Sequence, residues 1–186
     1  MIFGEKIRLR SVEREDLPRF VRWLNDPDVK SGLGLFLPLG MSEEEKWFEA
    51  NVDKDPIERA LAIDVKEGDE WVHVGSCGFF DFDQLAHNAE LGILIGNKDY
   101  WDQGIGTDTV KALVRHGFET LNLHRITLQV FAFNQRAIKV YDNLGFVHEG
   151  RLREHFYRSG EYHDIVMMGL LRQEWSETSG EGETDG

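Results

Sequence analysis

Segments with the pattern of a β-strand alternate with segments that have the pattern of an amphipathic helix along most of the chain. Alternating or continuous apolar residues predict strands at 6–11, 59–65, 71–82, 90–95, 125–130, 147–156 and 162–170. Apolar residues at helical spacing predict helices at 17–24, 42–52, 107–121 and 135–144. This order predicts a mixed α/β (α+β) fold. We expect a central mixed, mostly antiparallel sheet of about seven strands with helices on both faces.

Local signals predict where several of these elements begin and end. Ser42-Glu43-Glu44-Glu45 is typical of a capping box and opens the second helix. Pro18 fits only the first turn of the first helix, where backbone N–H groups need no partner within the helix. The turn sequences around Gly68 and at Ser159-Gly160 each predict a β-hairpin.

The charge balance and the cysteine content exclude several classes of protein. The 186 residues carry a formal net charge of −13, so we expect no nucleic-acid partner, and a cationic ligand is favoured. No apolar run approaches the roughly 20 residues of a membrane helix, so we expect no membrane partner. MIFGEKIRLR lacks the features of a secretory signal, and the single cysteine, Cys77, excludes a disulfide framework. We therefore expect a cytoplasmic protein.

The composition changes after Trp175. The sequence SETSGEGETDG contains four acidic residues, no basic residue and no hydrophobic residue. Such a segment cannot bury enough apolar surface to offset the entropy of ordering it. We expect a single domain over 1–175 and an acidic disordered tail over 176–186.

The segment from Lys30 to Gly40 is apolar and rich in glycine, which is unusual for a solvated loop. Two interpretations stay open. The loop either folds onto the core or forms a wall of a substrate pocket.

Two closely spaced glycines lie in the sequence W-D-Q-G-I-G-T, from Trp101 to Thr107, between a predicted strand and a predicted helix. Gly104 and Gly106 allow a sharp turn that directs several N–H groups to one point, and the positive end of the helix adds to the same place. The turn therefore favours a phosphate or pyrophosphate. It is neither a Walker loop nor a six-residue dinucleotide fingerprint, and a plain glycine-rich turn is the simpler interpretation.

A second block follows about thirty residues later, with the pattern N-x-x-A-x-x-x-Y-x-x-x-G-F. Its residues are Asn134, Ala137, Tyr141, Gly145 and Phe146. Asn134 is expected at or next to the N-cap of the last helix, and Ala137 and Tyr141 share one helix face.

With these two blocks the chain resembles the GNAT superfamily of acyl-CoA-dependent N-acetyltransferases. The glycine turn matches the pyrophosphate loop of that family, Q/R-x-x-G-x-G/A, except that Trp101 occupies the Q/R position. The resemblance covers Ile7 to Trp175 and implies a GNAT-like fold. It is closest to the branch of the ribosomal-protein N-terminal acetyltransferases and spermidine/spermine acetyltransferases, through A-E-L-G-I-L-I, F-N-Q-R-A-I-K-V-Y-D-N-L-G-F and E-G-R-L-R-E-H-F-Y.

The resemblance implies roles for individual residues. Glu90 matches a position at which relatives bind the amine or act as base through water, and a strand-end Glu facing solvent is the competing interpretation. Tyr141 matches the general acid, whereas the pattern alone favours an aromatic residue on the core face of a helix. Ile93 and Ile95 match the strand whose backbone groups bind the pantetheine arm and the thioester carbonyl.

The resemblance also implies that acetyl-CoA is the co-substrate and that no metal takes part, and the seven histidines show no metal-binding spacing. The residues expected to contact acetyl-CoA are Ile93, Ile95, Trp101, Asp102, Gln103, Gly104, Ile105, Gly106, Thr107, Asn134, Ala137 and Asn143.

The resulting expectation is transfer of an acetyl group from acetyl-CoA to a primary amine, by direct attack in a ternary complex. The acceptor is either a polyamine-like small molecule or a peptide N-terminus. The acidic composition favours a cation, but Lys30 to Gly40 is apolar where polyamine acetyltransferases of this branch carry acidic residues. The alternative is a non-catalytic acyl-CoA-binding sensor, which needs neither Glu90 nor Tyr141. A homodimer stays open.

Overall fold

The structure is a computed structural model, and it describes residues 1–175. The predicted acidic tail, 176–186, lies outside the described residues. The chain divides into two compact units, which we call unit 1 and unit 2. Unit 1 contains Met1–Phe80 and Gly92–Leu113, and unit 2 contains Asp81–Leu91 and the chain from Val114 onward. The expectation of one domain over 1–175 stays a prediction.

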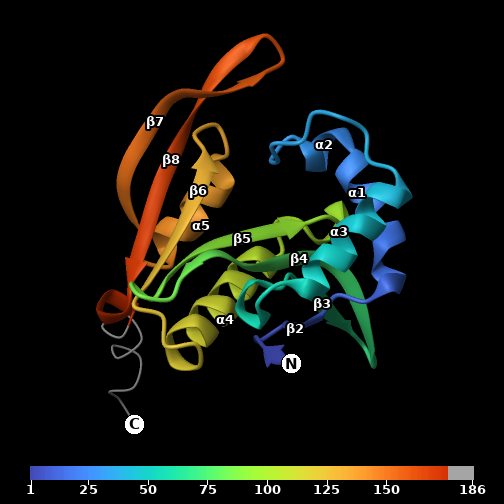
Figure 1. Ribbon diagram of the computed structural model, residues 1–186, viewed down its shortest axis with the longest axis horizontal. Helices are drawn as coiled ribbons and strands as arrows, with labels where there is room; N and C mark the ends of the chain where they lie inside the picture. The colour runs from blue at the N-terminus through green and yellow to red at the C-terminus, as the bar shows by residue number, and fades with distance from the viewer. Residues whose placement is uncertain (176–186) are drawn as a thin grey trace. The chain divides into compact units, whose positions relative to one another are not determined.

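Within residues 1–175 the strands form an eight-stranded sheet in the order β1-β2-β3-β4-β5-β6-β8-β7 (Figure 1). The strands are β1 Ile2–Phe3, β2 Ile7–Ser11, β3 Leu61–Glu67, β4 Glu70–Asp83, β5 Asn88–Ile95, β6 Arg125–Phe131, β7 Val147–Arg158 and β8 Glu161–Leu171. The β5–β6 pair is parallel, while the pairs within β1–β4 and the pairs β6–β8 and β7–β8 are antiparallel. The predicted mixed, mostly antiparallel sheet is confirmed, and the eighth strand is the two-residue β1, which is too short to show a pattern.

The helices are α1 Leu17–Asn25, α2 Pro27–Lys30, α3 Met41–Asp53, α4 Ile105–Glu119 and α5 Gln135–Asn143. Four of the helices lie close to their predicted positions, and the short α2 was not predicted. Pro18 falls in the first turn of α1, as predicted. The predicted capping box was displaced by two residues, because Gly40 rather than Ser42 is the N-cap of α3. Glu43 accepts a hydrogen bond from the Gly40 N–H at 2.7 Å, so the helix begins at Met41.

In unit 1 the helix α1 buries its apolar face in the core. Leu17, Phe20 and Trp23 are buried there, and the Phe20 and Trp23 rings meet edge to face at 5.8 Å between centroids. In unit 2 the core is built from α4, β6 and β8. Its most deeply buried side chains include Phe118, Leu123, Ile126, Leu128, Met168 and Leu170.

Both predicted hairpins are present. The β3–β4 pair closes through Glu67 and Glu70, and the β7–β8 pair closes through Arg158 and Glu161. At the second turn Ser159 and Gly160 have φ angles of 52° and 89°. Two consecutive positive φ angles match the right-handed twist of the strands, which explains why this dipeptide forms the turn.

A network of buried charges holds the start of α1 in unit 1. Asp16 is 2% exposed, and its carboxylate accepts two hydrogen bonds from Arg10, at 2.7 and 2.9 Å, and one from the Glu13 N–H at 2.9 Å. The Nδ1 atom of His73 lies 3.0 Å from the same carboxylate. Arg10 also donates to Asp64, which is equally buried. The Asp16 and Asp64 carboxylates are removed from water and therefore depend on their partners.

Candidate functional site

Glu90 is on β5, at the part of that strand that belongs to unit 2. It stands opposite Thr127 in the parallel β5–β6 pair. Its side chain is half-buried, and its Oε2 atom accepts a hydrogen bond from the Gln129 Nε2 atom at 3.1 Å. Glu90 is therefore partly accessible to solvent and has a hydrogen-bond partner on β6, and its role stays a prediction. Gln129 was missed from the sequence, since only the pairing of β5 with β6 brings it to Glu90.

Tyr141 is on α5 in unit 2, and its side chain is buried, with 8% exposure. Its ring packs edge to face against Phe146 at 5.8 Å between centroids. The hydroxyl forms no hydrogen bond with any residue in the described part of the chain. Burial raises the pKa of Tyr141 to about 12. The phenol therefore keeps its proton at neutral pH and has it available for a ligand.

The predicted N-cap of α5 is confirmed. The Asn134 side-chain oxygen accepts a hydrogen bond from the Ala137 N–H at 3.2 Å. This bond uses one of the free N–H groups of the first turn, so the Asn134 oxygen has a structural role. Asn143 is the last residue of the same helix and is exposed.

The glycine turn lies in unit 1 and leads directly into α4. Asp102 and Gly104 have φ angles of 59° and 79°, so the backbone is left-handed at both residues. The Gly104 carbonyl accepts the first helical hydrogen bond, from the Asp108 N–H at 3.0 Å. Ile105 is buried and begins the helix, which places Gly106 and Thr107 in its first turn.

The sequence interpretation of Gly106 was wrong in one respect. Gly106 is helical and has no positive φ, so the turn itself does not require a glycine there. A Cβ atom built on Gly106 would have no heavy atom within 4 Å. The protein leaves open space at this position, and a helix normally loses stability when it carries glycine. The open space next to a helix N-terminus fits the close approach of a phosphate to the backbone.

Trp101 links the glycine turn to β5. Its indole Nε1–H donates a hydrogen bond to the Ile95 carbonyl at 2.8 Å. Ile95 is thus held by the residue at the family's Q/R position, while Ile93 lies two residues earlier on the same strand. The two residues share one face of β5, because side chains alternate along a strand.

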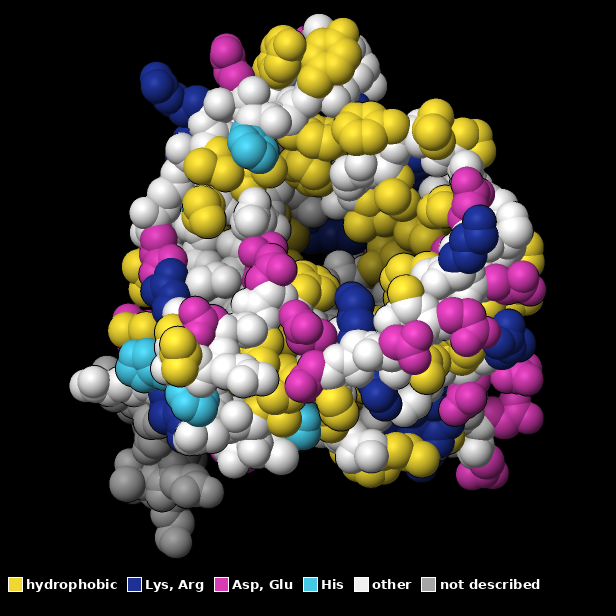
Figure 2. All heavy atoms as spheres, viewed as in Figure 1, with side chains coloured by type: hydrophobic (Ala, Val, Ile, Leu, Met, Phe, Trp, Pro, Cys, Tyr) yellow, Lys and Arg dark blue, Asp and Glu magenta, His cyan; other side chains and the backbone are white. Residues whose placement is uncertain are grey.

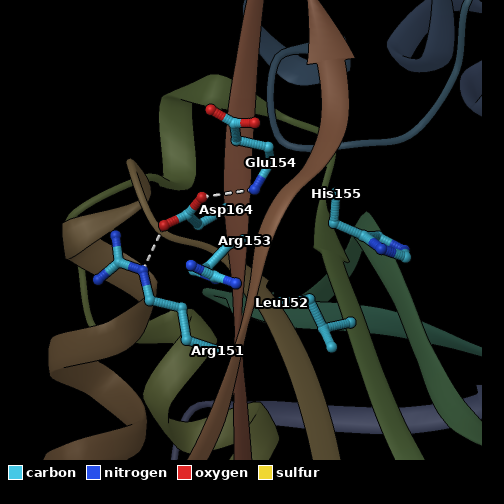
Figure 3. Close-up of a pocket in the computed structure, with 6 residues that line it drawn as sticks. All are labelled: Arg151, Leu152, Arg153, Glu154, His155 and Asp164. Atoms are coloured by element: carbon cyan, nitrogen blue, oxygen red, sulfur yellow. Dashed lines mark hydrogen bonds and ion pairs between the residues drawn. The ribbon is translucent and has the colours of Figure 1, made fainter.

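A cavity on the β7–β8 hairpin contains none of the predicted site residues. It has a volume of about 690 Å³ and is lined by Arg151, Leu152, Arg153, Glu154, His155 and Asp164. Glu154 has a φ of 50°, within an irregularity in the pairing of β7. Figure 3 shows Arg151 and the Glu154 N–H converging on Asp164, which accepts a hydrogen bond from each. The cavity therefore lies at an irregularity of β7, beside the ion pair of Arg151 with Asp164.

The Lys30 to Gly40 loop does not bury its largest side chains. Phe36 is 70% exposed and Leu37 is 77% exposed. Figure 2 shows hydrophobic side chains, in yellow, at the surface of the molecule. Packing of these two side chains on the core is therefore excluded, and the interpretation as a binding wall stays open.

Two other expectations concern metals and membranes. Within residues 1–175, no three His, Cys, Asp or Glu side chains are grouped so that they could hold a metal ion. No helix in the same part of the chain is long and apolar enough to cross a membrane. Cys77 is a buried free thiol, and burial raises its pKa above the ordinary value.

Known proteins resemble this chain over almost its full length. An uncharacterized N-acetyltransferase of Bacillus licheniformis is 30% identical over 177 residues, which are 94% of this chain and 98% of the relative. A putative ribosomal N-acetyltransferase of Bacillus subtilis is 27% identical, over 92% of this chain and 94% of the relative.

Solved structures give the same result. The crystal structure of spermidine N-acetyltransferase from Vibrio cholerae, in complex with CoA and spermine, superposes with a TM-score of 0.84 at 25% identity. The match covers 92% of this chain and 99% of that one. Residues 6–147 match the family model described as an acetyltransferase (GNAT) domain. The chain therefore belongs to the GNAT family of acetyltransferases, enzymes that use acetyl-CoA.

Proposed function

We propose that this enzyme transfers the acetyl group of acetyl-CoA to a primary amine, which attacks the thioester directly while both substrates are bound. The observation that carries the proposal is the Tyr141 hydroxyl, which belongs to a buried side chain and has no hydrogen-bond partner among the described residues. A merely structural role on a helix face needs a ring but no hydroxyl. The phenol is thus the group that packing does not explain.

Tyr141 acts as the general acid in this proposal. Acetyl-CoA supplies an acetyl group activated as a thioester, and transfer forms a carbon–nitrogen bond while the carbon–sulfur bond breaks. Donation of the phenolic proton to the sulfur makes the thiolate a better leaving group. Because the pKa of Tyr141 is raised to about 12, the phenolate recovers a proton from solvent after each turnover.

Glu90 acts on the amine. An alkylammonium group has a pKa near ~10.4, so it must lose a proton before it can attack. A carboxylate holds the cation and accepts its proton, directly or through water. The hydrogen bond from Gln129 fixes one carboxylate oxygen of Glu90 and leaves the other for the amine.

The glycine turn binds the diphosphate of acetyl-CoA. The left-handed backbone at Gly104, the start of α4 and the open space at Gly106 fit an anion close to the backbone. Ile93 and Ile95 offer strand backbone groups for the pantetheine arm. Asn134, Ala137 and Asn143 complete the proposed contacts from α5.

The acceptor is a primary amine of one of two classes, a polyamine-like small molecule or a peptide N-terminus. The net charge of −13 favours cations. The exposed apolar side chains of Phe36 and Leu37, in a loop without carboxylates, favour a less charged amine. A cytoplasmic location is supported by Cys77, a free thiol. A homodimer remains compatible with the proposal.

The Gly106→Ala variant distinguishes the effect of this glycine on protein stability from its effect on acetyl-CoA binding. We expect its free energy of unfolding to rise by about 0.5–1 kcal/mol, because alanine is the better helix residue and its Cβ meets open space. Acetyl-CoA affinity measured by calorimetry should fall by about tenfold, since overpacking a close contact costs roughly 1–3 kcal/mol. Gly150→Ala, also with open space at its Cβ, is the control. Unchanged affinity in a stabilised Gly106→Ala protein would remove this glycine from the binding site.

The Glu90→Gln variant tests the proposed amine chemistry. We expect kcat/KM for the amine to fall about tenfold or more, the value of a hydrogen bond to a charged group. The loss should be greatest at low pH, where more of the amine is protonated, and acetyl-CoA affinity should stay nearly constant. The control is Glu161→Gln, at the exposed end of the β7–β8 hairpin. A wild-type pH–rate profile for Glu90→Gln would show that Glu90 takes no part in catalysis.

A further inference from the structure

The N-terminal segment is fastened to the first turns of α4 in unit 1. The Asp108 carboxylate accepts hydrogen bonds from the backbone N–H groups of Glu5 and Lys6, at 3.0 and 2.7 Å. A Cβ atom on Gly4 would lie 2.6 Å from the Asp108 carboxylate oxygens, so glycine is needed for this approach. The Lys111 Nζ atom also lies 3.5 Å from the Glu5 carboxylate. The segment is therefore held beside the glycine turn.

This attachment brings the Lys6 ammonium to the glycine turn. The Lys6 Nζ atom donates a hydrogen bond to the Gln103 carbonyl at 3.1 Å. It would also lie 3.8 Å from a Cβ atom on Gly104. Within residues 1–175, Lys6 makes no ion pair, whereas Lys111 has a carboxylate partner in Glu5. No carboxylate in the described part of the chain therefore pairs with the Lys6 ammonium.

The glycine turn lacks a charged side chain of its own at the position where related enzymes have Gln or Arg. Trp101 stands there, and its indole N–H is used by the Ile95 carbonyl. Asp102, the next residue, adds a negative charge to the turn. An anion at this turn is therefore favoured by the backbone and the start of α4, but it finds no cation on the turn itself.

We propose that Lys6 supplies this cation and is a binding residue for the diphosphate of acetyl-CoA. An ammonium group attracts phosphate as a point charge without needing a fixed orientation. Its hydrogen bond to Gln103 holds it at the turn, and two of its N–H donors are left over. Asp108 and Gly4 take part indirectly, because they position the segment that carries Lys6. This role of Lys6 rests on one part of the proposed function, the binding of acetyl-CoA at the glycine turn.

Calorimetric titration of the full chain with acetyl-CoA tests the charge directly. We expect Lys6→Gln to raise the Kd by about three- to fivefold at low salt, the upper range for an exposed ion pair. Lys6→Arg keeps the charge and should stay within about twofold of the wild type. The Kd of Lys6→Gln should also depend less on ionic strength, because one screened attraction is lost. Lys111→Gln is the matched control, since it removes a neutralised cation from the same contact region.

A substrate without phosphates distinguishes the loss of the Lys6 charge from damage to the fold in Lys6→Gln. S-acetylpantetheine carries the same thioester but no diphosphate, so Lys6→Gln should leave its kcat/KM unchanged. A Lys6→Gln protein whose acetyl-CoA affinity and salt dependence match those of the wild type would overturn the proposal. Equal losses for both thioesters would also overturn it, because they would indicate damage to the fold. Neither result bears on Glu90 or Tyr141, whose variants test acetyl transfer at unchanged acetyl-CoA affinity.

Discussion

The Tyr141→Phe variant is expected to lose roughly 100-fold or more in kcat, the usual contribution of a positioned acid. The substitution keeps the buried ring and its contact with Phe146, and it removes only the hydroxyl. Acetyl-CoA affinity should survive, because the phenol matters mainly as the carbon–sulfur bond breaks. Kinetics under conditions where chemistry limits the rate, together with calorimetry, measure both quantities.

The pH dependence gives a second check on Tyr141. Because burial raises its pKa to about 12, the phenol stays protonated up to strongly alkaline pH. Any loss of wild-type activity between pH 8 and about 10 must then come from another group, and it should persist in Tyr141→Phe. Tyr157→Phe makes the same change at an exposed position of β7 and should leave kcat as it is. A folded Tyr141→Phe enzyme with near-normal kcat contradicts the general-acid assignment.

Among the variants proposed for this protein, Asp16→Asn is expected to lose the most stability. Removing one member of a buried charged network costs about 3–5 kcal/mol, because the remaining charges are left without compensation. In Asp16→Asn, the uncharged side-chain amide would face the donors of Arg10 and of the Glu13 backbone, and His73 would lie beside it. Chemical denaturation measures the free energy of unfolding.

Asp28→Asn provides the matched control for Asp16→Asn. Asp28 pairs with Lys98 but is 68% exposed, so its loss should cost less than about 1 kcal/mol. If Asp16→Asn were no more destabilising than Asp28→Asn, the buried network would not hold α1 in place.

The wild type should also lose stability at low pH, because Asp16 becomes protonated there. Burial alone would raise the pKa of this carboxyl. The hydrogen bonds from Arg10 and the Glu13 N–H and the contact with His73 outweigh burial and hold the pKa well below its usual range. A carboxyl whose pKa is lower in the folded than in the unfolded state stabilises the fold at pH values above its unfolded pKa, which is near ~3.9. This stabilisation is lost as the pH falls below that pKa. The difference in stability between wild type and Asp16→Asn should therefore shrink below pH 4.

The sequence predicted the elements whose signal is local. The β7–β8 turn was predictable because Ser159-Gly160 accepts positive φ angles, and the N-cap of α5 was predictable because Asn134 suits that position. The start of α3 was misplaced because several acidic residues in a row offer more than one cap. Only the observed bond from Gly40 to Glu43 selects among them.

The candidate site was predictable where its residues are consecutive, as in the glycine turn. Residues joined by pairing or by long-range contacts were not. Gln129 lies 39 residues from Glu90, and Lys6 lies 97 residues from Gln103. No pattern in the chain connects them, because their contacts depend on strand pairing and on the Asp108 attachment. The backbone reason given for Gly106 was wrong, because this residue lies in the first turn of α4, and its place in the binding site stays a prediction.

Acetyl transfer to an amine tests the central claim most directly. The enzyme is incubated with acetyl-CoA and a panel that includes spermidine, peptides with a free N-terminal amine and the same peptides with a blocked N-terminus, and released CoA thiol is recorded. With the best acceptor, both substrates are then varied. We predict CoA release that requires a free primary amine and initial-rate lines that intersect, as direct attack in a ternary complex demands. Parallel lines would contradict direct attack, and tight acetyl-CoA binding without CoA release for any amine would identify a sensor rather than an enzyme.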